Sequence, residues 1–181
     1  MKTGKYVVVD VEKANNSHSS ICQIGLVVFE NGVQTQVFES LVNPLSEFNP
    51  IHINIHGIKA DDVINAPTMS DLQDQLSNYF DQAVICSYGT SDKFALDCYF
   101  DVGAMRWVDV SKEVRHAIPE FKKGGHKLSN VIQHIGLELP PGEFHNALVD
   151  AKAALDILRY CVDVKNIKLQ TFMNNGNLSL L

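Results

Sequence analysis

The sequence lacks a hydrophobic run long enough to cross a membrane, which would take about 20 apolar residues in succession. Its start, MKTGKYVVVD, lacks the pattern of a secretory signal peptide, because the apolar run Val7–Val9 is short and meets an acid at once. The 4 cysteines are scattered and form no CxxC pair. We therefore expect buried, reduced thiols in a cytoplasmic protein without a membrane association.

Positive charge is also scarce, with 15 Lys and Arg against 21 Asp and Glu and a net charge of −6. This balance argues against a protein that coats duplex nucleic acid through a basic surface. It does not exclude an enzyme that holds a strand end through bound cations. The length of 181 residues, 45% of them hydrophobic, fits one domain with a substantial core, and no internal repeat or low-complexity segment is present.

The first part of the chain predicts an antiparallel meander. The β-branched run Tyr6–Val11 is typical of a buried strand, and Ile21–Glu30 predicts a second. Asn31-Gly32 is a strong hairpin signal, so Val33–Val42 is expected to return beside the second strand.

The remainder predicts alternating helices and strands. Helical segments between 50 and 80 are broken at Gly57 and Pro67, and Thr68 is expected to cap the helix that follows. Further strands are expected at 83–86 and 106–110, and further helices at 91–100, 126–135 and 146–164. The predicted fold class is α/β, a mixed five-stranded sheet (a three-stranded antiparallel meander plus parallel strands) flanked by helices. Residues 1–165 form the expected domain, and 166–181 a C-terminal tail without a clear pattern.

Asp10 and Glu12 end the first apolar strand. Side chains two apart on a strand point to the same face, so both carboxylates project together. Adjacent carboxylates repel each other unless a proton or cation lies between them, and Mg²⁺ prefers oxygen ligands of this kind. The alternative is a strand that has simply reached solvent.

His145 and Asp150 lie in HNALVDA, where a loop enters the last helix. Five residues leave the two side chains about 140° apart on a regular helix. They converge only if His145 precedes the helix and Asn146 lies near its cap. The alternative is a surface histidine and an acid that merely favours the helix dipole.

Asp92, in SYGTSDKFAL, is expected in the first turn of a helix that follows a short strand. Alone, it has the same helix-dipole explanation as Asp150. Together, however, the three motifs resemble in their order the DnaQ-like, DEDDh 3′→5′ exonucleases, which include proofreading subunits of bacterial replicative polymerases, RNase T and oligoribonuclease. The stretches IHGIKADDVINAPT and KLSNVIQHIGLEL are similar to family segments as well, and the resemblance covers Tyr6 to Val164.

The resemblance implies an RNase H-like fold and a phosphodiester hydrolase that shortens single-stranded nucleic acid from its 3′ end. It implies that four carboxylates hold two Mg²⁺ ions, for which Mn²⁺ can substitute, and that His145 is the general base; the carboxylates are those of Asp10, Glu12, Asp92 and Asp150. Asp10 is the best candidate to contact both ions. An imidazole, with an ordinary pKa of about 6.5, is suited to take a proton from water at physiological pH. The products implied are nucleoside 5′-monophosphates.

Three further residues are candidates for substrate binding. Lys13 follows Glu12 where the family commonly has threonine, and it either turns outward or reaches the phosphates of the strand. Tyr88 lies in a Ser-Tyr-Gly sequence similar to the Ser-Trp-Gly form of ERI-type RNA trimmers, and it either stacks on a base or is buried after the strand. His56, in IHGI, either packs the helix break or contacts the terminal nucleotide.

The sequence leaves the substrate open. DNA is slightly favoured over RNA, an exoribonuclease of the same chemistry is the alternative, and a catalytically silent binding module is a third hypothesis. A polymerase or a sliding clamp is a possible partner, because Asn177–Leu181 (NLSLL) loosely resembles short clamp-binding peptides. The oligomeric state does not follow from the sequence.

Overall fold

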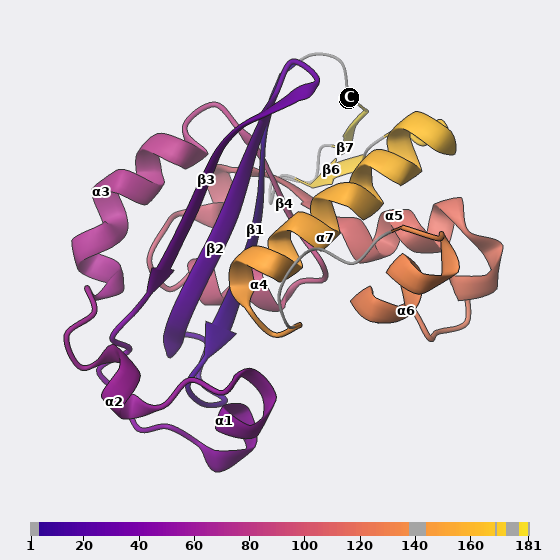
Figure 1. Ribbon diagram of the computed structural model, residues 1–181. Coiled ribbons are helices and arrows are strands. Elements are labelled where there is room, and N and C mark those ends of the chain that lie inside the picture. Colours follow the sequence, from indigo (N-terminus) through magenta and orange to yellow (C-terminus); the bar gives the residue numbers. More distant parts are fainter. Residues whose placement is uncertain (1–3, 138–143, 169, 173–177, 181) are drawn as a thin grey trace.

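A computed structural model describes residues 4–137, 144–168, 170–172 and 178–180. Its centre is one twisted sheet with the strand order β3-β2-β1-β4-β5-β6-β7 (Figure 1). The sheet is mixed, because antiparallel and parallel pairs meet at β1.

Five strands form the part of the sheet that the sequence predicted. The meander consists of β1, β2 and β3, and β4 and β5 run parallel to β1 beyond it; their bounds are Lys5–Lys13, Ile21–Glu30, Val33–Leu41, Val84–Ser87 and Arg106–Asp109. The predicted mixed five-stranded sheet flanked by helices is confirmed. At the hairpin, Asn31 and Gly32 both have positive φ, 49° and 94°, as a two-residue turn between twisted strands requires.

Two short strands extend this sheet. β6 (Gln170–Phe172) pairs with β5, and β7 (Leu178–Leu180) pairs with β6, both antiparallel. The sequence showed no pattern here, because a three-residue strand is too short for a visible period and forms only against an existing edge. The predicted boundary between a domain at 1–165 and a tail at 166–181 stays a prediction.

The sheet has a core on each face. Along β1, Val7 and Val9 are fully buried against α3 and neighbouring residues, whereas Tyr6 and Val8 pack under α7. This alternation is the strand period of two, with both faces covered. Asp10 and Glu12 continue the row of Tyr6 and Val8, so their side chains emerge on the α7 face.

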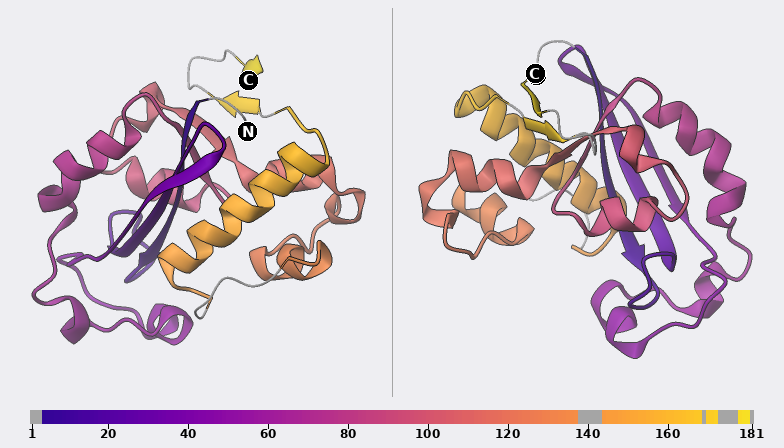
Figure 2. Two further views of the ribbon diagram at one scale, coloured as in Figure 1. Left: turned by 45° about the horizontal axis from the view of Figure 1, so that its top comes forward. Right: turned by 180° about the vertical axis from the view of Figure 1, so that it is seen from behind.

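The helices divide between the two faces (Figures 1 and 2). α5, α6 and α7 cover one face and α3 the other, while α1 and α2 lie beyond the ends of β1 and β2. The helix bounds are α1 Pro50–His56, α2 Ala60–Val63, α3 Met69–Phe80, α4 Ser91–Leu96, α5 Val110–Ala117, α6 Leu128–His134 and α7 Ala147–Arg159, with 3₁₀ turns at Val102–Ala104 and Pro119–Phe121 and a π-helical end at Tyr160–Val164.

Local signals set most of these bounds. Gly57, at φ 78°, ends α1, and Thr68 caps α3 through a reciprocal pair of hydrogen bonds with Asp71. α5 was not predicted, and the strand predicted before it extended to Val110. That boundary was wrong, because the Asp109 carboxylate accepts a hydrogen bond from the Ser111 N–H and so begins a helix at Val110.

Within the described ranges of the chain, none of the helices is both long and apolar enough to span a bilayer.

Candidate active site

The carboxylates of β1 lie beside the first turn of α7. In the antiparallel register, Asp10 is opposite Gly25 and Glu12 is opposite Gln23 of β2. A Cβ atom at Gly25 would overlap the backbone of Ala147 and Leu148, so the start of α7 rests directly on this glycine. The missing side chain is what allows α7 to bring its own residues down beside the β1 acids.

The start of α7 has the arrangement that helix arithmetic required. Asn146 is the N-cap, and its side chain accepts a hydrogen bond from the Val149 N–H at 3.0 Å. His145 precedes the helix in a left-handed conformation, φ 68°, which few residues other than glycine adopt. Its backbone N–H donates to Asp150 Oδ2 at 3.2 Å, so the histidine folds back over the acid five residues later. The predicted convergence of His145 and Asp150 is thus present in the structure.

Asp92 reaches the same place from α4. It is 5% exposed, and its Oδ1 accepts a hydrogen bond from the Val11 N–H, between the two β1 acids, at 3.2 Å. Three segments that are far apart in the sequence therefore contribute acids to one end of the sheet.

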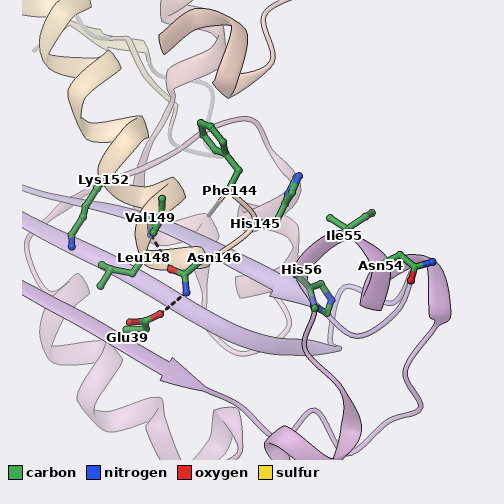
Figure 3. A pocket seen from close by; sticks show the side chains of 11 residues that line it. Glu39, Asn54, Ile55, His56, Phe144, His145, Asn146, Leu148, Val149 and Lys152 are labelled. Atoms are coloured by element: carbon green, nitrogen blue, oxygen red, sulfur yellow. Dashed lines mark hydrogen bonds between the residues drawn. The ribbon is translucent and has the colours of Figure 1, made fainter. Parts of the chain in front are cut away.

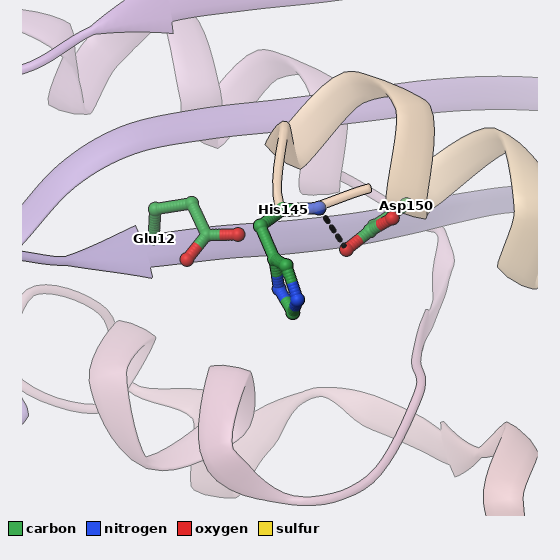
Figure 4. Close-up of side chains that lie close together, drawn as sticks. All are labelled: Glu12, His145 and Asp150. Atoms are coloured by element: carbon green, nitrogen blue, oxygen red, sulfur yellow. Dashed lines mark hydrogen bonds between the residues drawn. The ribbon is translucent and has the colours of Figure 1, made fainter. Parts of the chain in front are cut away.

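Glu12, His145 and Asp150 come closest together. One ligand atom from each of the three lies within 4.8 Å of the other two. Figure 4 shows the three side chains side by side, with the His145 backbone N–H directed at Asp150. The other carboxylate oxygen of Asp150, Oδ1, is buried and has no hydrogen-bond partner among the described residues. A buried oxygen without a donor, next to further acids, suits a hard divalent cation.

Burial raises the pKa of every acid in the group, and for Asp10, Glu12 and Asp92 the charges of neighbouring acids raise it further. Burial, then the charges of Asp92, Glu12 and Asp150, hold the pKa of Asp10 well above its usual range. Burial and the charges of Asp150 and Asp92 raise the pKa of Glu12 to about 8. Burial raises the pKa of Asp92 to about 7, against hydrogen bonds that lower it. The pKa of Asp150 is raised by burial too, partly offset by the His145 hydrogen bond. These groups are costly to ionise together unless cations neutralise them.

The charge of Lys13 lowers the pKa values of both Glu12 and Asp92, which indicates that its side chain lies on the side of the acids.

His56 contacts the end of β1 from α1. Its Nδ1 accepts from the Ile58 N–H at 3.0 Å, so the ring is held with its proton on Nε2, which donates to the Lys13 carbonyl at 3.1 Å. Burial lowers the pKa of His56, in keeping with a neutral ring. The ring therefore braces α1 against the end of β1, while one edge lines a cavity of about 640 Å³ beside His145.

Tyr88 is not grouped with these residues. Its hydroxyl donates to the His126 carbonyl at 2.6 Å, and its ring packs against the core between the sheet and α7. It lines a separate cavity, about 350 Å³, with Ser111 and His126. A role for Tyr88 in binding substrate stays a prediction, and the hydrogen bond accounts for the residue without it.

Sequence reasoning missed Gly25. The available signal was a glycine within the otherwise apolar strand ICQIGLVVFE, a position that marks either a bulge or the close approach of another backbone.

The sequence of this chain matches the RNase T family, described as exonuclease, over residues 7–158. The chain belongs to the exonuclease family. The prediction that it belongs to a DnaQ-like exonuclease family is confirmed by this match.

Relatives in sequence and structure agree with this family. The PolC-type DNA polymerase III of Oceanobacillus iheyensis is 25% identical over 164 residues, which cover 82% of this chain but 11% of the polymerase. This chain thus spans about a tenth of the length of the curated relatives it matches. Exonuclease X in complex with 5′ overhanging duplex DNA has a TM-score of 0.70 and 19% identity, covering 90% of this chain and 93% of that one. The nuclease domain of 3′hExo, a DEDDh family member bound to rAMP, also has a TM-score of 0.70, with 16% identity and coverage of 92% and 96%.

Proposed function

We propose that this protein is a metal-dependent 3′→5′ exonuclease that hydrolyses the terminal phosphodiester bond of single-stranded nucleic acid and releases nucleoside 5′-monophosphates. One observation carries the proposal. Acids from β1, α4 and α7 meet beside His145, and burial raises the pKa of each of them. Such an arrangement is unfavourable for folding alone, so we infer that it is retained for its chemistry.

Asp10, Glu12, Asp92 and Asp150 would hold two divalent ions, Mg²⁺ or in its place Mn²⁺. The residues fit such ions, because all four offer hard oxygen ligands and Asp150 Oδ1 is buried without a donor among the described residues. When bound, divalent ions make hydroxide available from water near neutral pH and offset the charge of a phosphodiester that is being cleaved. Asp10 is our candidate to contact both ions, since its pKa responds to the charges of the other three acids.

His145 would be the general base. The His145 side chain is exposed. The hydrogen bond from its backbone N–H to Asp150 holds the backbone of His145 beside the acids, and with it the Cα atom from which the ring extends. The ring would take a proton from the attacking water and pass it to solvent. A neutral imidazole is needed for this step.

Three residues would contact the strand itself. The charge of Lys13 lowers the pKa values of Glu12 and Asp92, so its ammonium would also attract a phosphate bound beside them. His56 lines the cavity beside His145 and would present a ring edge to the terminal nucleotide. Tyr88 is the weakest of the three, because its hydroxyl is already hydrogen-bonded to a backbone carbonyl.

We favour DNA as the substrate, since the relatives include PolC-type DNA polymerases. RNA is the alternative, supported by the fold shared with an exonuclease bound to rAMP.

The polymerase relatives also make a polymerase a candidate partner. For a clamp, Asn177 and Leu181 of the candidate peptide lie outside the described residues, and 178–180 form β7, so clamp binding would have to free that strand. A cytoplasmic location rests on four free, dispersed cysteines.

The test is digestion of 5′-labelled single-stranded DNA and RNA oligonucleotides of the same sequence, with Mg²⁺ and with a chelator. We expect a ladder of products shortened from the 3′ end, abolished by the chelator, and faster for DNA. Faster digestion of RNA would select the alternative substrate. Binding of either strand without any Mg²⁺-dependent cleavage would instead support a catalytically silent module.

A further inference from the structure

Glu39 of β3 lies across the sheet from the candidate acids, on the other side of the start of α7. The register places Asp10 opposite Gly25 and Gly25 opposite Glu39. Directly paired residues in adjacent strands point to the same face. The first turn of α7 therefore sits on Gly25 with one carboxylate on each flank.

A closed set of hydrogen bonds joins Glu39 to the helix start. Glu39 Oε1 accepts from Asn146 Nδ2 at 2.8 Å, the bond drawn as a dashed line between these two residues in Figure 3. The same oxygen accepts from Gln23 Nε2 at 3.0 Å. Gln23 Oε1 in turn accepts from the Ala147 N–H at 3.1 Å. Gln23 is only 6% exposed and its bond to the Ala147 N–H is buried, whereas Glu39 lies at the exposed edge of the set.

This set of bonds fixes the helix start in place as well as capping it. Asn146 and Gln23 each satisfy one N–H of the first turn, at Val149 and Ala147. Without Glu39, either amide could still cap the helix, but no bond would tie their two side chains to each other or to β3. His145 immediately precedes the cap, so its position over Glu12 depends on where the cap is held.

We propose that Glu39 is a positioning residue for the reaction: through Gln23 and Asn146 it holds the start of α7 so that His145 stands over Glu12. The inference rests on the proposed function, since it gives Glu39 a role in the step that His145 performs. The hydrogen bonds matter for this role and the negative charge does not, because one oxygen, Oε1, accepts both bonds.

Two variants separate bonding from charge. In Glu39→Gln the amide oxygen can accept both bonds while its NH₂ faces away, whereas Glu39→Ala can accept neither. We expect Glu39→Ala to lower kcat roughly 10-fold, the scale of a small misplacement of a reacting group, and to leave KM within about twofold. Glu39→Gln should keep most of the wild-type kcat. Glu47→Ala is the matched control, because its exposed carboxylate forms none of the hydrogen bonds found among the described residues.

A double-mutant cycle shows whether Glu39 acts through His145. In a His145→Ala background, adding Glu39→Ala should leave the residual single-turnover rate unchanged within about twofold. A further 10-fold loss in that background would overturn the inference, and so would a Glu39→Gln variant as slow as Glu39→Ala.

Amide hydrogen exchange tests the hydrogen bonds that Glu39, Gln23 and Asn146 form at the start of α7, here called the brace, without measuring activity. The Ala147 amide should exchange faster in Glu39→Ala than in wild type, Glu39→Gln or Glu47→Ala. If the wild-type protein digests neither DNA nor RNA, the proposed function fails while the exchange result still reports on the brace. Equal exchange in all four proteins would overturn the brace whatever the activity.

Discussion

The two halves of the candidate site are built differently. In the acid half, Asp92 and Asp150 are buried and Asp10 and Glu12 are half-buried. Its members are held by regular structure, Asp10 by strand β1 and Asp92 by a hydrogen bond from the Val11 N–H. The histidine half is exposed, and His145 sits at φ 68° between a loop and a helix. Substitutions in the two halves should therefore differ in their effects on rate, metal binding and stability.

The largest effect should come from the acid half. Asp10→Asn should lower kcat by roughly 10³-fold or more, because it removes the carboxylate placed to contact both ions. In chelator the same variant should melt at a higher temperature than wild type, since it relieves the repulsion that raises the pKa of Asp10. Oligonucleotide digestion and thermal melting measure the two effects.

Asp97→Asn, at the exposed end of α4, is the control for charge and should change neither quantity. An Asp10→Asn enzyme as fast as wild type would mean that the nuclease activity resides elsewhere.

A change in the histidine half should lower kcat without lowering the affinity for metal. His145→Ala should lower kcat by about 10²- to 10⁴-fold, the usual contribution of a positioned base. Because its ring is exposed, Mn²⁺ affinity, measured by titration calorimetry, should change little. The control is His134→Ala, on α6 away from the acids. A large loss of Mn²⁺ affinity would make His145 a ligand, as its closeness to Glu12 and Asp150 also allows.

Gly25 joins the two halves, so a side chain there should disturb both. In Gly25→Ala the added Cβ meets the backbone of Ala147 and Leu148 and pushes the start of α7 outward. We expect a loss of about 1–3 kcal/mol in the free energy of unfolding, from urea titration, and a lower kcat. Unchanged stability and rate would show that α7 does not need this close approach.

The acid half should also make stability depend on pH. The folded pKa values of Glu12 and Asp92 are about 8 and about 7, above their ordinary values of 4.5 and 3.8. At a pH between the ordinary and the folded pKa of each group, the folded state therefore binds more protons than the unfolded state. In chelator, the melting temperature should therefore fall as pH rises from about 5 to 8. Saturating Mg²⁺ should reduce this fall, and Asp10→Asn should reduce it without metal. A melting temperature that rises over this range in chelator contradicts the account.

The smallest effect is expected outside the site. Tyr88→Phe removes one hydrogen bond to the His126 carbonyl and should cost about 1 kcal/mol of stability, with KM and kcat unchanged. A several-fold rise in KM would bring Tyr88 into the substrate path after all.

Local sequence rules predicted the features that depend on neighbours along the chain. The strand period put Asp10 and Glu12 on one face, and helix arithmetic required His145 to lie before the cap at Asn146, as observed. Thr68 and Gly57 marked helix ends for the same reason.

Features that depend on distant segments did not follow from the sequence. The need for Gly25 arises only when α7 is placed on β2, and the role inferred for Glu39 exists only across three strands and a helix. The π-helical end at Tyr160–Val164 and the strand pair β6–β7 likewise carry no visible local pattern.

Anomalous diffraction from crystals of the wild-type protein soaked in Mn²⁺ would show whether the four acids bind metal. We expect manganese peaks bounded by the carboxylates of Asp10, Glu12, Asp92 and Asp150, one of them beside Asp150 Oδ1. Peaks only at other places, with these four side chains free of metal at saturating Mn²⁺, would contradict this expectation.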